Sequence, residues 1–176
     1  GEGGAVVTND EKLYYKMLLI HNHGSVERYE HLIPGHNYRL EGLQAAILNV
    51  KLKYIEDWTE RRRLNARYYG QCLQDIDEVI TPEEMNGVRH VYHLYVIRAQ
   101  DRNRLRDFLQ NRGVATGLHY PKPIHLMRAY EHLGYRQGAF PVAERYAGEI
   151  LSLPMFPELT KDQIEYVAES IRSFYR

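Results

Sequence analysis

Apolar residues recur at helical spacing in several parts of the chain. The longest such stretch covers residues 41–74, where Leu43, Ile47 and Val50 lie three to four positions apart and no proline interrupts the pattern. A stretch of this length predicts one long helix, straight or bent, of the kind that spans two lobes or packs on a partner. Shorter periodic stretches predict further helices over 8–24, 101–113, 140–154 and 160–176.

Polar residues at the start of these stretches predict where the helices begin. Thr8 with Glu11, and Thr160 with Gln163, have the spacing of a capping box, in which each side chain bonds the other residue's backbone N–H. Asp101 stands where a helix N-cap is expected. The first, second and fourth of these shorter helices therefore have a capping residue at their start, and the third begins with Pro141 in its first turn.

Strand-like runs rich in Val, Ile and Tyr lie between the predicted helices. They predict strands at 5–8, 78–80, 90–99 and 114–120, so that residues 89–120 form a strand–helix–strand unit. Residues 25–40 show no periodicity and contain Pro34 and Gly35, which predicts a long loop of the kind that often carries function. The alternation of helices and strands indicates an α/β or α+β fold.

Composition narrows the classes of protein that fit this chain. Its 176 residues carry 23 basic and 23 acidic side chains, without the basic excess that is typical of nucleic-acid binders. No apolar run approaches the roughly 18 residues that a membrane span needs. A single cysteine, Cys72, fits a reducing compartment, so we expect a cytoplasmic protein without nucleic-acid or membrane partners. The 15 Tyr and nine His suit a wet, sugar-sized cleft.

Histidine pairs in "HNHG" and "HVYH" raise the possibility of a metal site. Neither a second cysteine nor an H-E-x-x-H sequence supports zinc, so no metal ligand is assigned, although a His-rich metal-binding protein stays open as an alternative. The opening "GEGG" precedes a strand-like run rather than a helix. That context favours a tight turn over a phosphate-binding loop.

Two loops hold the most informative polar side chains. Asn37 and Arg39 come just before a predicted helix, where backbone N–H groups and the helix dipole favour an anion. The same residues are equally compatible with a structural role, in which Asn37 bonds loop backbone and Arg39 pairs with a carboxylate. His119, Tyr120 and His125 lie in a loop stiffened by two prolines, either as held binding groups or as parts of a structural turn.

The chain resembles the DegT/DnrJ/StrS family of sugar aminotransferases. The resemblance rests on blocks in the family's order and spacing: "GEGGAVVTND", "HNHG", "GHNYRLEGLQAAIL", "RHVYHLYVIR", "GVATGLHYPKPIHL" and "FPVAERYAGEILSLPMFPELT". It implies an α/β fold that is the C-terminal portion of a fold-type I transferase dependent on pyridoxal phosphate. In that portion, residues 1–40 form the end of the large domain and an interface loop. Residues 41–75 form a connecting helix, and residues 76–176 form a small α/β domain.

The resemblance also implies an activity for the complete protein. Family members form homodimers that use pyridoxal phosphate to move an amino group from a donor, usually glutamate or glutamine, to a keto group on a nucleotide-linked sugar. Their products feed polysaccharide or antibiotic biosynthesis. The lysine that holds the cofactor precedes the GEGG-type turn in the family. We therefore expect no catalytic residue in this chain and no activity from it alone, and Lys122 is interpreted as a surface lysine.

The resemblance assigns roles to residues of both informative loops. Asn37 is expected to reach the cofactor phosphate of the neighbouring subunit, and Arg39 to support the same anionic region. Contacts to the nucleotide-sugar are expected from His119, Tyr120, His125, Asn22, His23 and Tyr29. An alternative is a non-catalytic remnant or partner subunit that completes the site of another chain.

Overall fold

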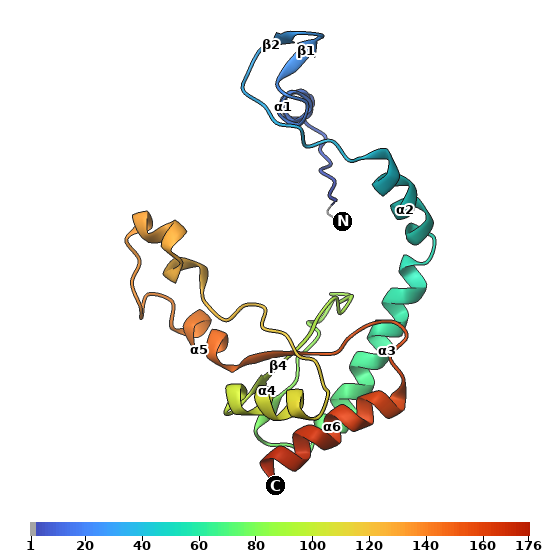
Figure 1. Cartoon of the computed structure of the whole chain (residues 1–176), viewed down its shortest axis with the longest axis vertical. Helices are drawn as coiled ribbons and strands as arrows, with labels where there is room; N and C mark the ends of the chain where they lie inside the picture. Colours follow the sequence, from blue (N-terminus) through green and yellow to red (C-terminus); the bar gives the residue numbers. More distant parts are fainter. Residues whose placement is uncertain (1–2) are drawn as a thin grey trace. The chain divides into compact units, whose positions relative to one another are not determined.

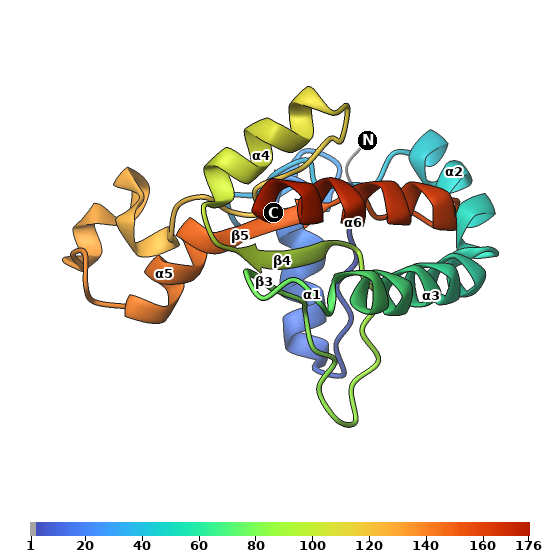
Figure 2. The ribbon, with the colours of Figure 1, turned by 90° about the horizontal axis from the view of Figure 1, so that it is seen from below.

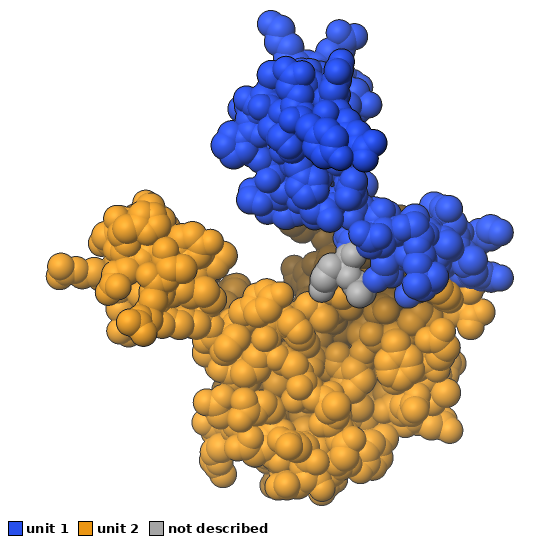
Figure 3. Space-filling model, turned by 45° about the horizontal axis from the view of Figure 1, so that its top comes forward, with its two compact units in different colours: residues 1–55 blue, residues 56–176 orange. Residues whose placement is uncertain are grey.

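The computed structural model describes residues 3–176, so two residues of the glycine-rich opening turn lie outside the described part. The chain divides into two compact units, residues 1–55 and 56–176, which Figure 3 shows in different colours. Figure 1 gives the order of helices and strands along the chain. The division separates a sparsely packed unit 1 from a unit 2 that has a hydrophobic core.

Unit 1 begins with helix α1, Glu11–His21. Its N-cap is Asp10, whose side chain accepts from the backbone N–H groups of Lys12 at 2.8 Å and Leu13 at 3.0 Å. The predicted capping box of Thr8 and Glu11 is therefore wrong, since the Thr8 hydroxyl accepts from the Asp10 N–H instead. The strand predicted at 5–8 is also wrong, because no described segment pairs with these residues.

A small hairpin and a second helix complete unit 1. Strands β1 (Ser25–Glu27) and β2 (Glu30–His31) pair antiparallel within the segment that was predicted to be a loop throughout. Helix α2 covers Gly42–Leu52, and α3 begins at Ile55. The single helix predicted over 41–74 is thus two helices. Between them, the N–H groups of residues 53 and 54 bond carbonyls only three positions back, which interrupts the α-helical ladder.

Unit 2 is built on a three-stranded antiparallel sheet in the order β3–β4–β5. The strands are Val79–Ile80, Tyr95–Ala99 and Ile150–Leu153. Along β4, residues 95, 97 and 99 are buried and 96 and 98 only partly so, the alternation expected of a sheet with one packed face. Helices α3 (Ile55–Leu73), α4 (Arg102–Asn111) and α6 (Lys161–Tyr175) pack against the buried face of this sheet (Figure 2).

The core of unit 2 joins all of these elements. Its buried apolar residues run from Ala66 to Ile171, and the Tyr69 ring of α3 stacks on the Tyr95 ring of β4 with centroids 4.9 Å apart. The start of α6 is fixed by Thr160 and Gln163, whose reciprocal hydrogen bonds confirm the predicted capping box. Unit 2 therefore has a hydrophobic core of its own.

Four predictions in unit 2 are corrected by the structure. The helix predicted over 140–154 is α5 (Pro141–Glu149) only, because the chain turns extended at Ile150 and continues as β5. The strand predicted at 114–120 is a single bridge between Gly117 and Ser152, and that predicted at 90–99 starts only at residue 95. Asp101 is the N-cap residue of α4 as predicted, but it has a left-handed conformation with φ of 49°, and its side chain makes no capping hydrogen bond.

Short 3-10 helices η1 (Ile124–Leu126) and η2 (Arg128–Leu133) shape the proline-containing segment before α5. Among the described residues, none of the helices combines the length and the apolar character that crossing a membrane requires. The combination of helices with a small sheet agrees with the mixed α/β class expected from the sequence.

Candidate functional site

The candidate site in unit 1 is built on two backbone segments that run side by side. The N–H groups of residues 23, 36 and 38 donate to the carbonyls of residues 36, 20 and 21, at 2.8, 2.8 and 2.9 Å. Gly24 and Gly35 permit this approach: a Cβ on Gly24 would lie 1.7 Å from the Ile33 carbonyl oxygen, and one on Gly35 would lie 2.2 Å from the Gly24 nitrogen. The pairing places Asn22 opposite Asn37 as a β-bridge.

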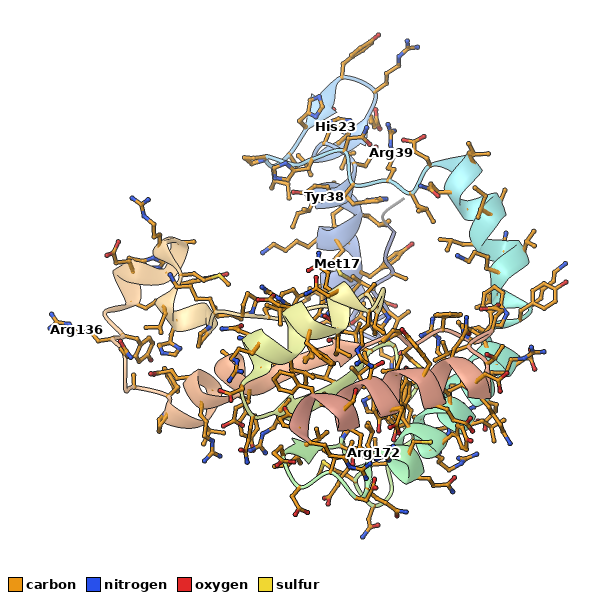
Figure 4. The ribbon with its side chains drawn as sticks, turned by 60° about the horizontal axis from the view of Figure 1, so that its bottom comes forward. Met17, His23, Tyr38, Arg39, Arg136 and Arg172 are labelled. Carbon is orange, nitrogen blue, oxygen red and sulfur yellow. The ribbon has the colours of Figure 1, made fainter. Side chains whose placement is uncertain are left out.

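Arg39 joins the side chains of these two asparagines. Its Nε donates to Oδ1 of Asn37 at 3.0 Å, and its Nη1 donates to Oδ1 of Asn22 at 3.2 Å. Figure 4 labels Arg39 beside His23 and Tyr38 in this part of unit 1. Arg39 thus contacts Asn37 directly, and its expected role toward the anionic region of a cofactor stays a prediction.

The arginine fixes the orientation of both amide groups. A guanidinium only donates hydrogen bonds, so the amide atom that faces it must be oxygen. The NH₂ groups of Asn22 and Asn37 therefore point away from Arg39, and within residues 3–176 neither is hydrogen-bonded to a protein acceptor. Two oriented amide donors beside a cation form a donor set that suits an anionic oxygen group such as a phosphate.

A hollow of about 440 Å³ lies next to this cluster in unit 1. Its walls include Asn22, His23, Tyr29 and Arg39, so four of the predicted binding residues share one surface. Tyr29 stands at the hairpin turn with φ of 71°, and the Arg28 guanidinium lies 5.0 Å from the centre of its ring. The hollow thus combines an exposed aromatic ring with two arginines.

In unit 2, the loop between α4 and α5 holds the other predicted residues. Nδ1 of His119 lies 2.8 Å from Oγ of Ser152, a buried residue of β5. Tyr120 follows with its ring edge-on to His119 at 5.5 Å and is 69% exposed. Tyr120 and Lys122 both line a mainly apolar hollow of about 250 Å³ against α5. His119 and Tyr120 are therefore exposed side chains, and the contact of His119 with Ser152 fixes the loop that carries them.

His125 has different surroundings from those two residues. Its Nε2 lies 3.0 Å from Oε1 of Glu144, and only 9% of its side chain is exposed. Glu144 also accepts from the N–H groups of Gly138 and Phe140, and these bonds, that of Gly138 foremost, hold the pKa of the carboxyl below its usual value. This geometry favours a structural role for His125, while its predicted contact to a nucleotide-sugar is untested.

The structure adds residues that the sequence analysis missed. Arg28 had no distinguishing neighbour in the sequence, and its position over Tyr29 depends on the hairpin. Ser152 was assigned to a helix, so its contact with His119, 33 positions away, could not be anticipated. Among the described residues, no group of three or more His, Cys, Asp or Glu side chains is placed to hold a metal ion.

Comparison with known proteins identifies the class to which this fold and these loops belong. The model of the DegT/DnrJ/EryC1/StrS aminotransferase family matches residues 1–172. The chain therefore belongs to this aminotransferase family, as the sequence blocks indicated.

The chain is also similar to individual curated proteins. The chain is 47% identical to a pleiotropic regulatory protein of Geobacillus stearothermophilus, over 100% of this chain and 48% of the relative. It is 36% identical to the dTDP-3-amino-3,6-dideoxy-alpha-D-galactopyranose transaminase of Aneurinibacillus thermoaerophilus, over 98% of this chain and 47% of that enzyme.

A solved structure matches the fold as well. The crystal structure of S. venezuelae DesV in complex with a ketimine intermediate has a TM-score of 0.89 and 34% identity, and the match covers 96% of this chain and 45% of DesV. The chain thus spans about half the length of the relatives it matches. The expected α/β fold of a C-terminal aminotransferase portion is confirmed.

Proposed function

We propose that the full-length protein containing these residues transfers an amino group to a keto group of a nucleotide-linked sugar. Pyridoxal phosphate is the proposed cofactor, and when bound it serves as the electron sink of the reaction. Membership of the aminotransferase family supports this proposal, as do relatives whose names specify dTDP-linked amino sugars. The amino donor is proposed to be glutamate or glutamine, as the resemblance implies.

The arrangement around Arg39 is the observation that carries the proposal for this chain. Asn37 and Asn22 present NH₂ donors while their oxygens are held by Arg39. These donors would bind phosphate oxygens of the cofactor, and Arg39 would add a positive charge without having to move. The residues in place thus fit a phosphate, and their part is to bind and orient it.

The residues around the neighbouring hollow would bind the sugar nucleotide. Tyr29 offers an exposed ring face for a base or sugar, and Arg28 offers a cation for a diphosphate. His23 and, in unit 2, His119 and Tyr120 are proposed to supply further polar contacts. His125 is proposed to hold the 134–144 segment through Glu144, so that its effect on the substrate is indirect.

The active assembly is proposed to be a homodimer, with Asn37 serving the cofactor of the second copy. Support comes from α2, where Leu43, Ile47 and Val50 share one helical face and are 77%, 48% and 58% exposed. An exposed apolar face of this kind usually marks an interaction surface. A second copy of the chain is the partner that the family resemblance implies.

Replacement of Asn37 in the full-length protein tests the proposed phosphate contact. Asn37→Ala removes a donor to a charged group, so the dissociation constant for pyridoxal phosphate should rise roughly ten- to hundredfold, or about 1.5–3 kcal/mol. Asn37→Asp should weaken binding further, because it places a carboxylate against the phosphate. Cofactor absorbance during equilibrium titration measures both effects.

The matched control is Asn86→Ala, which removes an exposed amide from a loop of unit 2. This variant should retain the affinity of the unmodified protein. If Asn37→Ala also binds pyridoxal phosphate with unchanged affinity, Asn37 does not contact the phosphate.

A further inference from the structure

The His119 ring is seated between a buried hydroxyl and a glycine. Ser152 is 4% exposed, and its backbone N–H and carbonyl both bond Gly117, at 2.8 and 3.0 Å. Its Oγ lies 2.8 Å from Nδ1 of His119. A Cβ on Gly117 would lie 2.6 Å from Cε1 and 3.2 Å from Nδ1 of the same ring. The ring can therefore approach Ser152 only because residue 117 has no side chain.

The direction of the hydrogen bond follows from the burial of Ser152. A buried hydroxyl needs an acceptor for its proton, since an unsatisfied donor in the interior is costly. Within the described residues, Nδ1 of His119 is the partner that the Ser152 side chain bonds. The hydroxyl therefore donates to Nδ1, and the neutral ring must carry its own proton on Nε2.

We propose that Ser152 is a positioning residue that holds His119 in the Nε2-protonated form, so that this histidine donates a hydrogen bond to an oxygen of the bound ligand. The inference rests on the proposed function for the identity of the ligand, whose phosphate, hydroxyl or keto oxygens are all acceptors. His119 itself is exposed, so its Nε2 side can be reached from solvent. A fixed tautomer matters because the opposite one would present a lone pair to the same oxygen.

The strand that carries Ser152 continues into a segment that is hydrogen-bonded to helix α3. The segment that follows β5 has three consecutive carbonyls, and each accepts from a side chain of α3. Tyr69 OH bonds Pro154 O at 3.2 Å, Arg62 Nη1 bonds Met155 O at 2.9 Å, and Asn65 Nδ2 bonds Phe156 O at 3.1 Å. Ser152 is thereby held by the core helix as well as by the sheet, as precise placement of a binding group requires.

Nitrogen NMR of the 176-residue chain tests the tautomer without any cofactor or turnover. The chain is labelled with ¹⁵N-histidine and studied at about pH 8.5, where an ordinary imidazole is neutral. We expect Nδ1 of His119 to show the shift of an unprotonated ring nitrogen and Nε2 that of a protonated one. The His119→Gln spectrum assigns these signals. A protonated Nδ1 in the unmodified chain would overturn the proposal.

Two substitutions break the same contact from opposite sides. Ser152→Ala removes the hydroxyl, and Gly117→Ala pushes the ring away from it. In each, the ratio of Nε2- to Nδ1-protonated ring should fall about fivefold, the change expected from loss of one hydrogen bond. Ser152→Thr, which keeps a hydroxyl, should restore the ratio. An unchanged ratio in both Ala variants would overturn the proposal.

The controls separate this effect from a general loss of structure. Ser170→Ala removes another buried hydroxyl, on α6, and should leave the His119 signals unchanged. His125, held by Glu144, should keep its own signals in the Ser152 and Gly117 variants. A change in the His125 signals together with those of His119 would indicate unfolding of the loop and would count against a specific contact between Ser152 and His119.

The ligand part of the proposal is tested in the full-length protein. Ser152→Ala should raise the KM for the nucleotide-sugar about fivefold, with kcat and the affinity for pyridoxal phosphate unchanged. An unchanged KM would overturn the proposed contact to the ligand. If the protein aminates no nucleotide-sugar at all, the proposed function fails, while the tautomer measurement still decides the role of Ser152.

Discussion

The two units of this protein differ in how their structure is held. In unit 2, every member of the hydrophobic core cluster lies between Ala66 and Ile171, and nine of its large side chains are almost completely inaccessible to solvent. In unit 1, Leu19 is the buried apolar side chain among the described residues. Its loops are held by backbone hydrogen bonds instead of by a hydrophobic core, and two glycines allow the close approach that these bonds need.

This difference indicates how each group of proposed binding residues is held in position. His119 is placed by a strand and a helix that belong to a packed core, so its position is set within unit 2. The Asn22–Asn37–Arg39 cluster is placed by local pairing in a unit with little burial. Because buried apolar area is the main source of stability, unit 1 is expected to gain order from a partner or a ligand.

The largest expected effect is on the core of unit 2. Ile164→Ala removes a completely buried side chain and should lower the free energy of unfolding by about 2–5 kcal/mol. Leu43→Ala, on the exposed face of α2, should change it by less than about 0.5 kcal/mol. Urea unfolding followed by fluorescence of Trp58, the one tryptophan, measures unit 2 directly. Equal losses for the two variants would contradict the contrast between the units.

The next effect concerns self-association through unit 1. We expect the chain to form a dimer or larger species, and the double variant Leu43→Glu with Val50→Glu should raise its dissociation constant at least about tenfold, because two charges must be desolvated. Sedimentation over a wide concentration range measures the change. Asn49→Glu on another side of α2 is the control and should associate normally. A clean monomer in the unmodified chain would argue against this use of α2.

The smallest effect expected is the pH dependence that Glu144 gives to unit 2. Hydrogen bonds from Gly138 and Phe140 and the contact with His125 lower the pKa of Glu144 from its ordinary value of 4.5. A lowered folded-state pKa adds stability above the ordinary value, and this is lost as the pH falls from about 4.5 through the folded-state pKa. Thermal unfolding of Glu144→Gln should accordingly depend less on pH between about 5 and 3 than that of the unmodified chain. Identical pH profiles would contradict this.

The sequence predicted the elements whose signals are local. The capping box at Thr160 and Gln163, and the apolar face of α6 behind it, depend on neighbouring residues and are found as expected. Strand β5 was misassigned because "ILSL" continues the apolar run of α5, and periodicity does not separate a short buried strand from a helix. The break after α2 has no proline or glycine to mark it.

The candidate site was only partly predictable, because several of its contacts join residues that are distant in the sequence. Asn37 and Arg39 stood out because they precede a helix and match a family block. The contact of Arg39 with Asn22 spans 17 positions, and it exists only because Gly24 and Gly35 allow two segments to pair. The Ser152 contact with His119 required knowledge of the strand register, which composition and spacing do not contain.

We propose above that these two unlike units belong to an enzyme that aminates a nucleotide-linked keto sugar. The direct measurement supplies the full-length protein with pyridoxal phosphate, ¹⁵N-glutamate or amide-labelled ¹⁵N-glutamine, and dTDP- or UDP-linked keto sugars, and follows the sugar by mass spectrometry. The account predicts transfer of ¹⁵N to a nucleotide-linked sugar by the full-length protein, and none by the 176-residue chain alone. Absence of transfer to every such sugar by the full-length protein, or turnover by the short chain alone, would contradict it.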